Sequence, residues 1–559
     1  MSGSTETKEK DWIEFDIKEP HNQEDVFKGD VSNISEGMIY YFPTTNEIDE
    51  EHVQQSDLML SGKLKLSNSH PEVETILPPD WENNLTGSQN WLFILHSLRW
   101  LEIPLNAYRY TKNEKYLTFI NSVIESWIEG NNPRKETSEM AWRDHPTSYR
   151  LRFFVYYRSV YTKIENFDES FDRKLLLSIY QHMLYHNDQD NFHMKSNHSL
   201  EMIGAILSAS HHYKNVFKRA DEFFSLSVKL LTEYLNLNFS EKGYHFEQSP
   251  GYHWYVLKRL ILINDYLDHY NISVGTIVDL IPKILRANRM LMKPDFTFQT
   301  IGDTQKIDMK NQLRFEPKET SFILTDFEVC EESGYAIFRD DQSLTVFRCN
   351  NFIGSHGHSD FLSFTHYSHE TDWFIDSGYY TYNKDEHREY FTSSFAHNTV
   401  IINGKSGKPN DKKTELVFNN HNDYVKAGRY LDSGTHERSF QKVAESDYII
   451  NDIIRLNERG KVEQLFHIHP SISIKSISKN VIELENQDGV TCYVTQLNTI
   501  GTWEVIKGQE EPYIQGWYSE KFNKKVPTFT LKYVANDKES YLLKTFIHFS
   551  SCPLMDETV

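Results

Sequence analysis

Four residues in the second half of the sequence have types and spacing suited to metal binding or proton transfer. His356 and His358 stand two positions apart in SHGHSD, and such positions share one face of a strand. Asp376 in WFIDSGYY and His397 in SFAHNTV follow, each near the end of an expected strand. Two histidines and one aspartate are suitable ligands for Zn²⁺ or a related divalent ion. Ordinary core or surface histidines remain the alternative, since the chain has 25 histidines.

A second candidate is a tyrosine in FEQSPGYHWYVL. Ser249 is suited to the N-cap of a helix and Pro250 to its first position, which places Tyr252 in the first turn. The positive end of the helix dipole there would lower the tyrosine pKa and favour proton exchange with a substrate. Asn197 and His198, in KSNHSLEM, also precede an expected helix. Packing of Tyr252 and capping by Asn197 are the ordinary alternatives.

Helices and strands must position these residues, and the helices are expected first along the chain. Seven segments carry apolar residues at three- and four-residue spacing, and short polar connectors separate them. This pattern predicts stacked helix pairs in a bundle, a solenoid or a toroid, without a fixed-period repeat. The segments are 91–110, 115–130, 173–186, 198–213, 223–239, 252–270 and 274–291.

The sequence pattern changes near residue 296, and short runs of alternating apolar and polar residues dominate from about residue 330. Gly, Asn and Asp separate these runs, and Asn403-Gly404 is a hairpin signal. The second half is therefore expected to form a β-sandwich or a similar multi-sheet domain. The expected strands lie within 334–340, 343–349, 361–367, 372–378, 398–404, 447–456, 463–469, 471–477, 491–497 and 541–549.

Three parts of the chain follow from these patterns. Residues 1–80 read as a polar N-terminal extension with short strands, expected around Gly37 to Phe42. Residues 81–315 form the helical part and residues 316–559 the strand-rich part.

The composition limits the partners. The formal charge of −21 disfavours nucleic acid and anionic membranes, and it allows an anionic polysaccharide only where Arg, Lys and His converge in one cleft. No apolar run of about 18 residues is present, so no membrane span is expected. The N-terminal stretch lacks a signal-peptide pattern, which predicts a cytoplasmic protein, or a secreted or periplasmic one if a leader has been removed. The four cysteines are expected to be buried free thiols.

Taken together, these motifs resemble the heparinase II/III-like polysaccharide lyases. The matching stretches are SLRWL, SYRL, SNHSLE, FEQSPGYH, IGD, GHSDFLSF, DSGYYTYN and AHNTVIING, in the family's order and mainly between residues 85 and 410. The resemblance implies an α+β multidomain fold, with an N-terminal incomplete (α/α) toroid followed by a C-terminal antiparallel β-sandwich.

The resemblance also implies roles for the matched residues. Asn197, with His198, would bind a uronate carboxylate, and so stabilise the enolate-like transition state. Tyr252 would protonate the leaving glycosidic oxygen. His356 would be the base or a carboxylate neutraliser, and the choice of base among Tyr252, His198 and His356 stays open.

The resemblance implies a structural metal and further substrate contacts. His358, Asp376 and His397 would hold one divalent ion, with Zn²⁺ preferred and Mn²⁺ or Ca²⁺ as alternatives. The implied substrate contacts are Arg150, Glu247, Tyr380 and Tyr390, while Tyr382 is a further candidate tyrosine. The sequence departs from the family at Thr304-Gln305, which follows IGD, and at Thr392, where many relatives carry Arg.

The expected activity is cleavage of a uronic-acid-containing polysaccharide by β-elimination, which leaves unsaturated uronate ends. A glycosaminoglycan such as heparan sulfate, hyaluronan or chondroitin is preferred over alginate. Two alternatives stay open: an inactive glycan-binding protein of the same fold, and a metal-dependent hydrolase. The hydrolase motif HxHxDH is incomplete here, because Phe361 occupies its final position. A homodimer is also left open.

Overall fold

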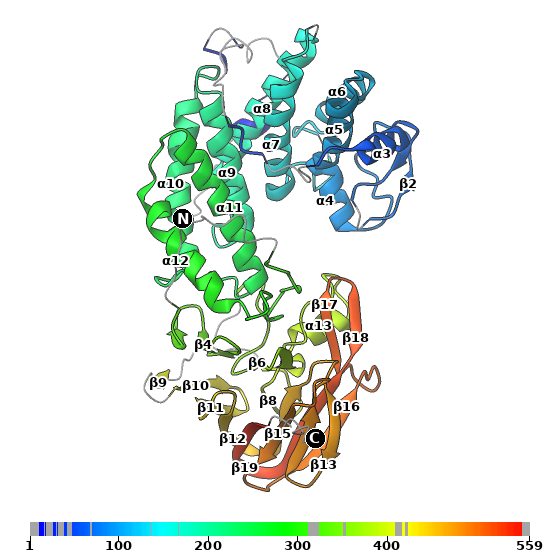
Figure 1. Cartoon of the computed structure of the whole chain (residues 1–559). Coiled ribbons are helices and arrows are strands. Elements are labelled where there is room, and N and C mark those ends of the chain that lie inside the picture. Colours follow the sequence, from blue (N-terminus) through cyan, green and yellow to red (C-terminus); the bar gives the residue numbers. More distant parts are fainter. Residues whose placement is uncertain are drawn as a thin grey trace, which may run out of the picture. The chain divides into compact units, whose positions relative to one another are not determined.

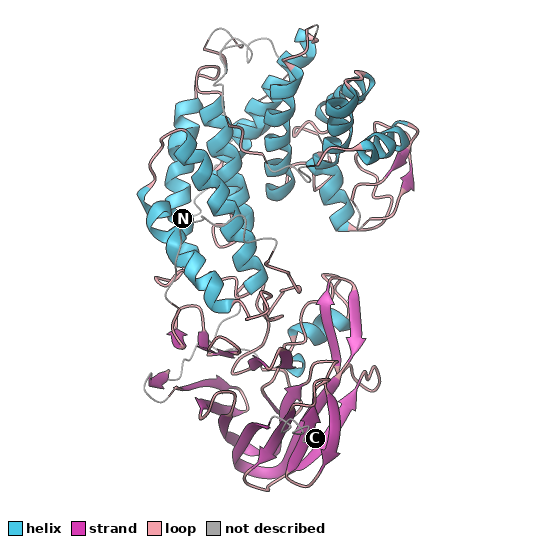
Figure 2. Ribbon diagram, viewed as in Figure 1, coloured by secondary structure: helices cyan, strands magenta, loops and turns pink. Residues whose placement is uncertain are grey.

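The structure is a computed structural model of the chain. It describes residues 10–15, 17, 26–28, 31, 38–41, 47–67, 70–135, 137–165, 167–310, 324–349, 354–407, 416–419 and 423–550. The chain forms two compact units, one of Met1–Leu237 with Leu262–Ile277 and the other of Asn238–Ile261 with Val278–Val559. Helices occupy the part coloured blue to green in Figure 1, and strands occupy most of the part coloured yellow to red. Figure 2 shows the same change from helix to strand.

Helices build the first unit, as the apolar periodicity predicts. Contacts join α5 to α6, α7 to α8 and α8 to α9, and α7 also contacts α4 and α9. This packing of successive helices confirms the expected helical fold of stacked pairs. The helices of this unit are α1 (Asp11–Glu14), α3 (Glu50–Leu60), α4 (Gln89–Ser97), α5 (Glu102–Thr111), α6 (Lys115–Gly130), α7 (Asp144–Tyr161), α8 (Glu169–Asn187), α9 (Asn197–His212) and α10 (Ala220–Asn238). The residues of α11 (Pro250–His269) and α12 (Gly275–Leu291) are divided between the two units.

The helix α7 lacks a clear apolar stripe and was not among the expected segments. It is buried on most sides, and its arginines reach buried acidic partners. Arg158 donates two hydrogen bonds of 2.7 Å to Asp172, and an Arg152 nitrogen lies 2.7 Å from a Glu201 oxygen. These ion pairs allow charged side chains inside the helical core.

The N-terminal part differs from the expected extension. A helix, α3, forms where only short strands were expected, and Asp49 and His52 close its first turn as a capping box. Residues 38–41 are not in a strand, while Gly37 and Phe42 lie outside the described residues. The short strands β1 (Lys63–Leu64) and β2 (Val73–Glu74) pair instead.

Antiparallel sheets build the second unit and confirm the expected sandwich. The strands β3 to β7 form a five-stranded meander, and a ten-stranded sheet has the order β13-β14-β15-β19-β12-β11-β10-β9, with β8 on β12 and β16 on β19. Rings from both sheets pack together, such as Phe347 and Phe364 of the meander on Phe440. A separate hairpin pairs β17 with β18.

The strands β4 to β8, β12, β13, β15 and part of β19 match the expected segments, whereas β3, β9, β10, β11, β14, β16, β17 and β18 lie outside them. Their bounds are β3 (Phe327–Cys330), β4 (Tyr335–Arg339), β5 (Leu344–Arg348), β6 (Phe364–Ser368), β7 (Thr371–Phe374), β8 (Val400–Ile402), β9 (Val417–Asn419), β10 (Tyr424–Leu431), β11 (Gly434–Lys442), β12 (Tyr448–His467), β13 (Ser473–Ile477), β14 (Val481–Glu485), β15 (Thr491–Gln496), β16 (Thr502–Lys507), β17 (Trp517–Lys521), β18 (Lys524–Pro527) and β19 (Phe529–Ser550). Positive φ angles at Asn403 and Gly404 make the expected turn after β8.

Other expectations have mixed outcomes. The predicted boundary between residues 315 and 316 lies outside the described residues, and the compact units divide the chain differently, since 238–261 belongs with the strand-rich unit. Three cysteines are buried and free as expected (Cys330, Cys349 and Cys492), and Cys552 lies outside the described residues. Among the described helices, none is both long and apolar enough to cross a membrane.

Candidate active site

The start of α11 fixes Tyr252 as the sequence predicts. Ser249 accepts a hydrogen bond from the Tyr252 N–H at 3.3 Å, and Pro250 is the first residue of the helix. Thr304 holds this turn from outside, because its hydroxyl lies 2.8 Å from the Ser249 hydroxyl and accepts from the Gly251 N–H at 3.1 Å. The departure from the family at Thr304 therefore has a structural role in the described site.

Tyr252 and His356 meet in the second unit. Their rings stack with centroids 3.3 Å apart and an interplanar angle of 8°. The Tyr252 hydroxyl lies 2.9 Å from the Tyr382 hydroxyl, which lies 3.3 Å from Nδ1 of His356. Tyr382 is 48% exposed, so solvent and ligands reach this group of three side chains. We call these three residues the Tyr-His-Tyr cluster.

The protonation state of Tyr252 differs from the expected one. Burial raises the pKa of Tyr252 to about 12, although the hydrogen bond with Tyr382 acts in the opposite direction. The expectation of a pKa lowered by the helix dipole is therefore wrong, because desolvation outweighs it. Burial also raises the pKa of Tyr382. Both hydroxyls are protonated near neutral pH and can donate protons.

Asp303 connects this cluster to neighbouring residues, and it was not among the predicted site residues. Its carboxylate lies 3.1 Å from Nδ1 of His356 and 3.0 Å from Nε2 of His358, and it accepts two hydrogen bonds from Arg388 at 2.7 and 3.2 Å. Burial alone would raise the pKa of Asp303, but the hydrogen bonds from His356, His358 and Arg388 lower it well below its usual range. The carboxylate is ionised and orients both histidine rings.

The backbone also holds Asp303 against the histidine loop. Its N–H donates to the carbonyl oxygen of His356 at 2.9 Å. Gly302 precedes it with a φ of 59°, and a Cβ there would lie 2.5 Å from the same oxygen. Only glycine allows this approach. The stretch IGD is part of the family resemblance described above. The structure explains two of its residues, because this turn requires Gly302 and places Asp303 against the histidine loop.

The three predicted metal ligands lie together beside Asp303. One ligand atom from each of His358, Asp376 and His397 lies within 4.8 Å of the other two, and all three residues are buried. Nδ1 of His358 and both ring nitrogens of His397 have no hydrogen-bond partner among the described residues, although Nδ1 of His397 is 2.9 Å from Asp376. Orphaned buried nitrogens beside a carboxylate fit a divalent cation. The second nitrogen of His358 on Asp303 completes the usual carboxylate support for such a ligand.

Asn197 and His198 lie in the first unit, at the start of α9. Ser196 caps this helix, so capping is not the role of Asn197, whose side chain is buried. Nδ1 of His198 lies 3.0 Å from a carboxylate oxygen of Asp144, and the His198 side chain is 41% exposed. This contact helps lower the pKa of Asp144 to about 2 against the opposing effect of burial. His198 is therefore oriented by an ionised carboxylate and reaches solvent.

Two of the predicted substrate contacts are contradicted by the structure, because both side chains are buried. Arg150 is fully buried, and it donates to His182 at 2.7 Å, to the carbonyl of His96 at 2.5 Å and to that of Ala141 at 2.7 Å. Its role is to tie helices together. Tyr390 is 5% exposed, and its hydroxyl accepts from the Gly516 N–H at 3.2 Å.

The other two predicted contacts differ from each other. Glu247 is buried, with a carboxylate oxygen 3.9 Å from Nε2 of His356, so it faces the Tyr-His-Tyr cluster. Tyr380 packs on His387 and Phe391, and the tyrosine that reaches His356 is Tyr382.

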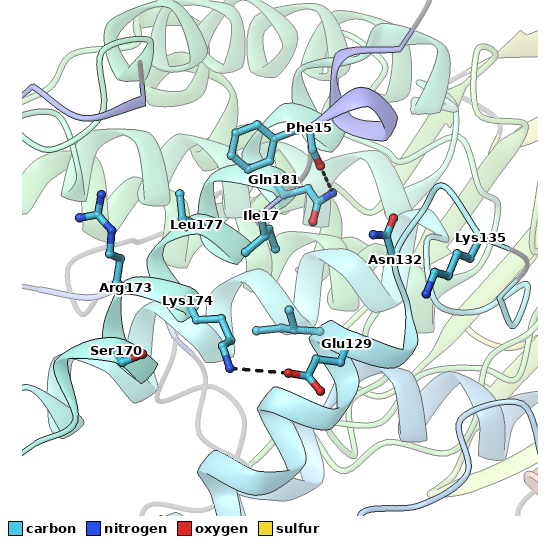
Figure 3. Close-up of a pocket in the computed structure, with 11 residues that line it drawn as sticks. Phe15, Ile17, Glu129, Asn132, Lys135, Ser170, Arg173, Lys174, Leu177 and Gln181 are labelled. Carbon is cyan, nitrogen blue, oxygen red and sulfur yellow. Dashed lines mark hydrogen bonds and ion pairs between the residues drawn. The ribbon is translucent and has the colours of Figure 1, made fainter. Parts of the chain in front are cut away.

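A cavity of about 420 Å³ lies in the first unit, lined by α6, α8 and the N-terminal segment. Figure 3 shows Lys174 directed toward Glu129 and the Phe15 carbonyl bonded to Gln181. None of the predicted site residues lines this cavity.

Comparison with known proteins gives the chain its family. A curated heparin-sulfate lyase of Bacteroides stercoris is 20% identical over 498 residues, covering 80% of this chain and 74% of the relative. A crystal structure of heparinase III has a TM-score of 0.76 at 15% identity, covering 91% of this chain and 86% of that one. A heparan sulfate lyase structure from Pedobacter heparinus has a TM-score of 0.67 at 15% identity, covering 92% and 84%.

Two family models together cover most of the chain. Residues 33–322 match the model described as heparinase II/III N-terminus, and residues 323–545 match the one described as heparinase II/III-like, C-terminal. The first alone spans more than half of the chain. The chain therefore belongs to the heparinase II/III-like polysaccharide lyase family.

Proposed function

We propose that this chain is a glycosaminoglycan lyase that acts on heparan sulfate or a related polymer by β-elimination. The curated relative from Bacteroides stercoris is a heparin-sulfate lyase, which favours this substrate class over hyaluronan, chondroitin and alginate. The observation that carries the proposal is the Tyr-His-Tyr cluster, in which a protonated Tyr252 lies against the His356 imidazole.

In the proposed reaction, His356 takes the proton from C5 of the uronate. A proton on Nδ1 is held by Asp303 at 3.1 Å, so Nε2 carries the lone pair that acts as base. The electron pair of the C–H bond forms the double bond between C4 and C5, and the bond from C4 to the glycosidic oxygen breaks. Asp303 and Glu247, with its oxygen 3.9 Å from Nε2, stabilise the imidazolium that results.

Tyr252 supplies the proton that the leaving oxygen needs. Its pKa of about 12 makes it a donor and not a base at neutral pH. Tyr382 contacts Tyr252 at 2.9 Å and is 48% exposed, so Tyr252 can be reprotonated from solvent through Tyr382, while His356 releases the abstracted proton from Nε2 to solvent after the product leaves. The binding of a uronate carboxylate by Asn197 and His198, in the first unit, stays a prediction from the family resemblance.

A divalent ion, with Zn²⁺ preferred, is proposed at His358, Asp376 and His397. Bound there, it would supply positive charge that fixes the three side chains. A fixed His358 would help to hold Asp303, and Asp303 would hold His356. The Asp303 carboxylate lies 3.0 Å from the His358 ring and 3.1 Å from the His356 ring. The proposed role of the ion is structural.

His358→Ala is expected to lower the melting temperature by roughly 3 °C or more. The variant loses a side chain that holds the proposed metal ion, and the bound ion stabilises only the folded chain. Metal content and thermal unfolding with and without a chelator measure this effect. The chelator should lower the melting temperature of the wild type and leave that of the variant unchanged. A wild-type protein that contains no metal and ignores the chelator would contradict the proposed site.

Asp303→Asn is expected to lower kcat by about 100-fold, because the amide no longer orients His356. The change in KM should be much smaller, since Asp303 lies behind the imidazole and is 3% exposed. Steady-state kinetics measures both constants, and circular dichroism reports whether the variant is folded. A folded variant with unchanged kcat would show that Asp303 does not position the base.

The substrate class is tested by offering the wild-type enzyme heparan sulfate, heparin, hyaluronan, chondroitin sulfate and alginate separately. The ultraviolet absorbance of the new conjugated double bond follows elimination continuously. We expect the fastest rise with heparan sulfate or heparin. A rise with alginate alone would overturn the substrate class, and no rise with any polymer would favour a glycan-binding protein.

A further inference from the structure

The tip of the β17–β18 hairpin carries two lysines that face each other. Lys521 and Lys524 are register partners across a two-residue turn formed by Phe522 and Asn523. Register partners in an antiparallel pair project from the same face, and like charges placed opposite each other destabilise a hairpin. We call Lys521, Phe522 and Lys524 the hairpin tip.

Neither lysine of the hairpin tip is neutralised by the protein. Both are exposed, and neither forms an ion pair with any described residue. The acidic neighbours along the chain are engaged elsewhere: Glu520 lies 3.1 Å from the ammonium of Lys306, and Glu510 lies 2.8 Å from that of Lys525. In a chain of net charge −21, this unpaired double positive charge is a local exception that an external anion would stabilise.

The hairpin tip is fixed in place by hydrogen bonds. The Phe522 N–H donates to the side-chain oxygen of Gln305 at 3.3 Å, and the Asn523 N–H donates to the carbonyl of Tyr380 at 2.8 Å. In the middle of β17, the Ser519 N–H donates to the carbonyl of Ser377 at 2.9 Å. The departure from the family at Gln305 thus serves to anchor this hairpin.

Aromatic contacts connect the hairpin tip to the Tyr-His-Tyr cluster. The Phe522 ring stacks on Tyr379 at 5.4 Å and lies 6.2 Å from the ring of Tyr382. Tyr382 in turn lies 6.4 Å from the ring of His356. Phe522 is partly exposed, so one aromatic surface runs from the catalytic histidine to the two lysines.

We propose that Lys521, Phe522 and Lys524 form a subsite for an anionic sugar next to the uronate that reacts at His356. The lysines bind a sulfate or carboxylate of that sugar, and the Phe522 ring packs against its apolar face. This inference rests on the proposed function, because it takes the polysaccharide held at the Tyr-His-Tyr cluster as its ligand. In this proposal Lys521 and Lys524 also supply positive charge that an anionic substrate needs.

The test compares the double variant Lys521→Gln/Lys524→Gln with the control Lys479→Gln. Lys479 is an exposed lysine of another hairpin turn, between β13 and β14, and has no ion-pair partner among the described residues. On heparan sulfate at low salt, the double variant is expected to raise KM about tenfold, with a much smaller change in kcat. Its kcat/KM should also depend less steeply on salt, because two screened charges are gone. The control should match the wild type in both respects.

A desulfated polymer of the same backbone separates the two anions. If the effect on KM disappears on this polymer, the lysines bind sulfate, and if it persists they bind carboxylate. A double variant with the KM and salt dependence of the control overturns the subsite. If the wild type cleaves no polymer, the proposed function fails, and the affinity of heparan sulfate for the wild type and the double variant still decides the subsite: equal affinities overturn it.

Discussion

Replacing Tyr252 with phenylalanine is expected to lower kcat on heparan sulfate by about a thousandfold. Phenylalanine keeps the ring that stacks on His356 at 3.3 Å, but it removes the hydroxyl that contacts Tyr382 at 2.9 Å. With a pKa of about 12, that hydroxyl stays protonated across the neutral range and supplies the proton for the leaving oxygen. Initial rates of ultraviolet absorbance increase measure the loss.

The matched control for this variant is Tyr430→Phe. Tyr430 lies in β10 and is 37% exposed, and the change removes a hydroxyl outside the site. Its rate should equal that of the wild type. A Tyr252→Phe enzyme with near-wild-type kcat would mean that another group protonates the glycosidic oxygen.

His356→Ala is expected to lower kcat by about a thousandfold as well, because it removes the proposed base. Added imidazole should restore part of the rate, since the space left by the ring lies beside the exposed Tyr382. Rates with and without imidazole measure both effects.

A histidine outside the site provides the comparison. His548→Ala removes a side chain that is 43% exposed and pairs with Asp447, and its rate should stay at the wild-type value. If His356→Ala is folded and retains most of its activity, the base is another residue, and His198 is then the first candidate.

Most helices with regular apolar spacing could be predicted from the sequence, whereas α3, α7 and several strands, such as β10 and β11, were not. Helices such as α6 and α9 follow apolar spacing because each buries one side. The helix α7 buries charged side chains in ion pairs, so its sequence shows no apolar stripe. The helix α3 is short, and tertiary contacts with α5 support it.

The site shows the same limit. Local motifs identify His358, Asp376 and His397, but the function of Asp303 depends on partners from two distant segments, and spacing contains no such information. Arg150, in SYRL, was expected as a substrate contact from the family resemblance. Its burial follows from two carbonyl acceptors and His182, which only the folded chain brings together.

The most direct test of the elimination mechanism is the mass of the products formed from heparan sulfate in water enriched in heavy oxygen. Elimination breaks the bond between C4 and the glycosidic oxygen without adding water. We therefore predict products that carry an unsaturated uronate and no oxygen from the solvent. Products that carry one solvent oxygen and no double bond would show hydrolysis, and would contradict the roles assigned to Tyr252 and His356.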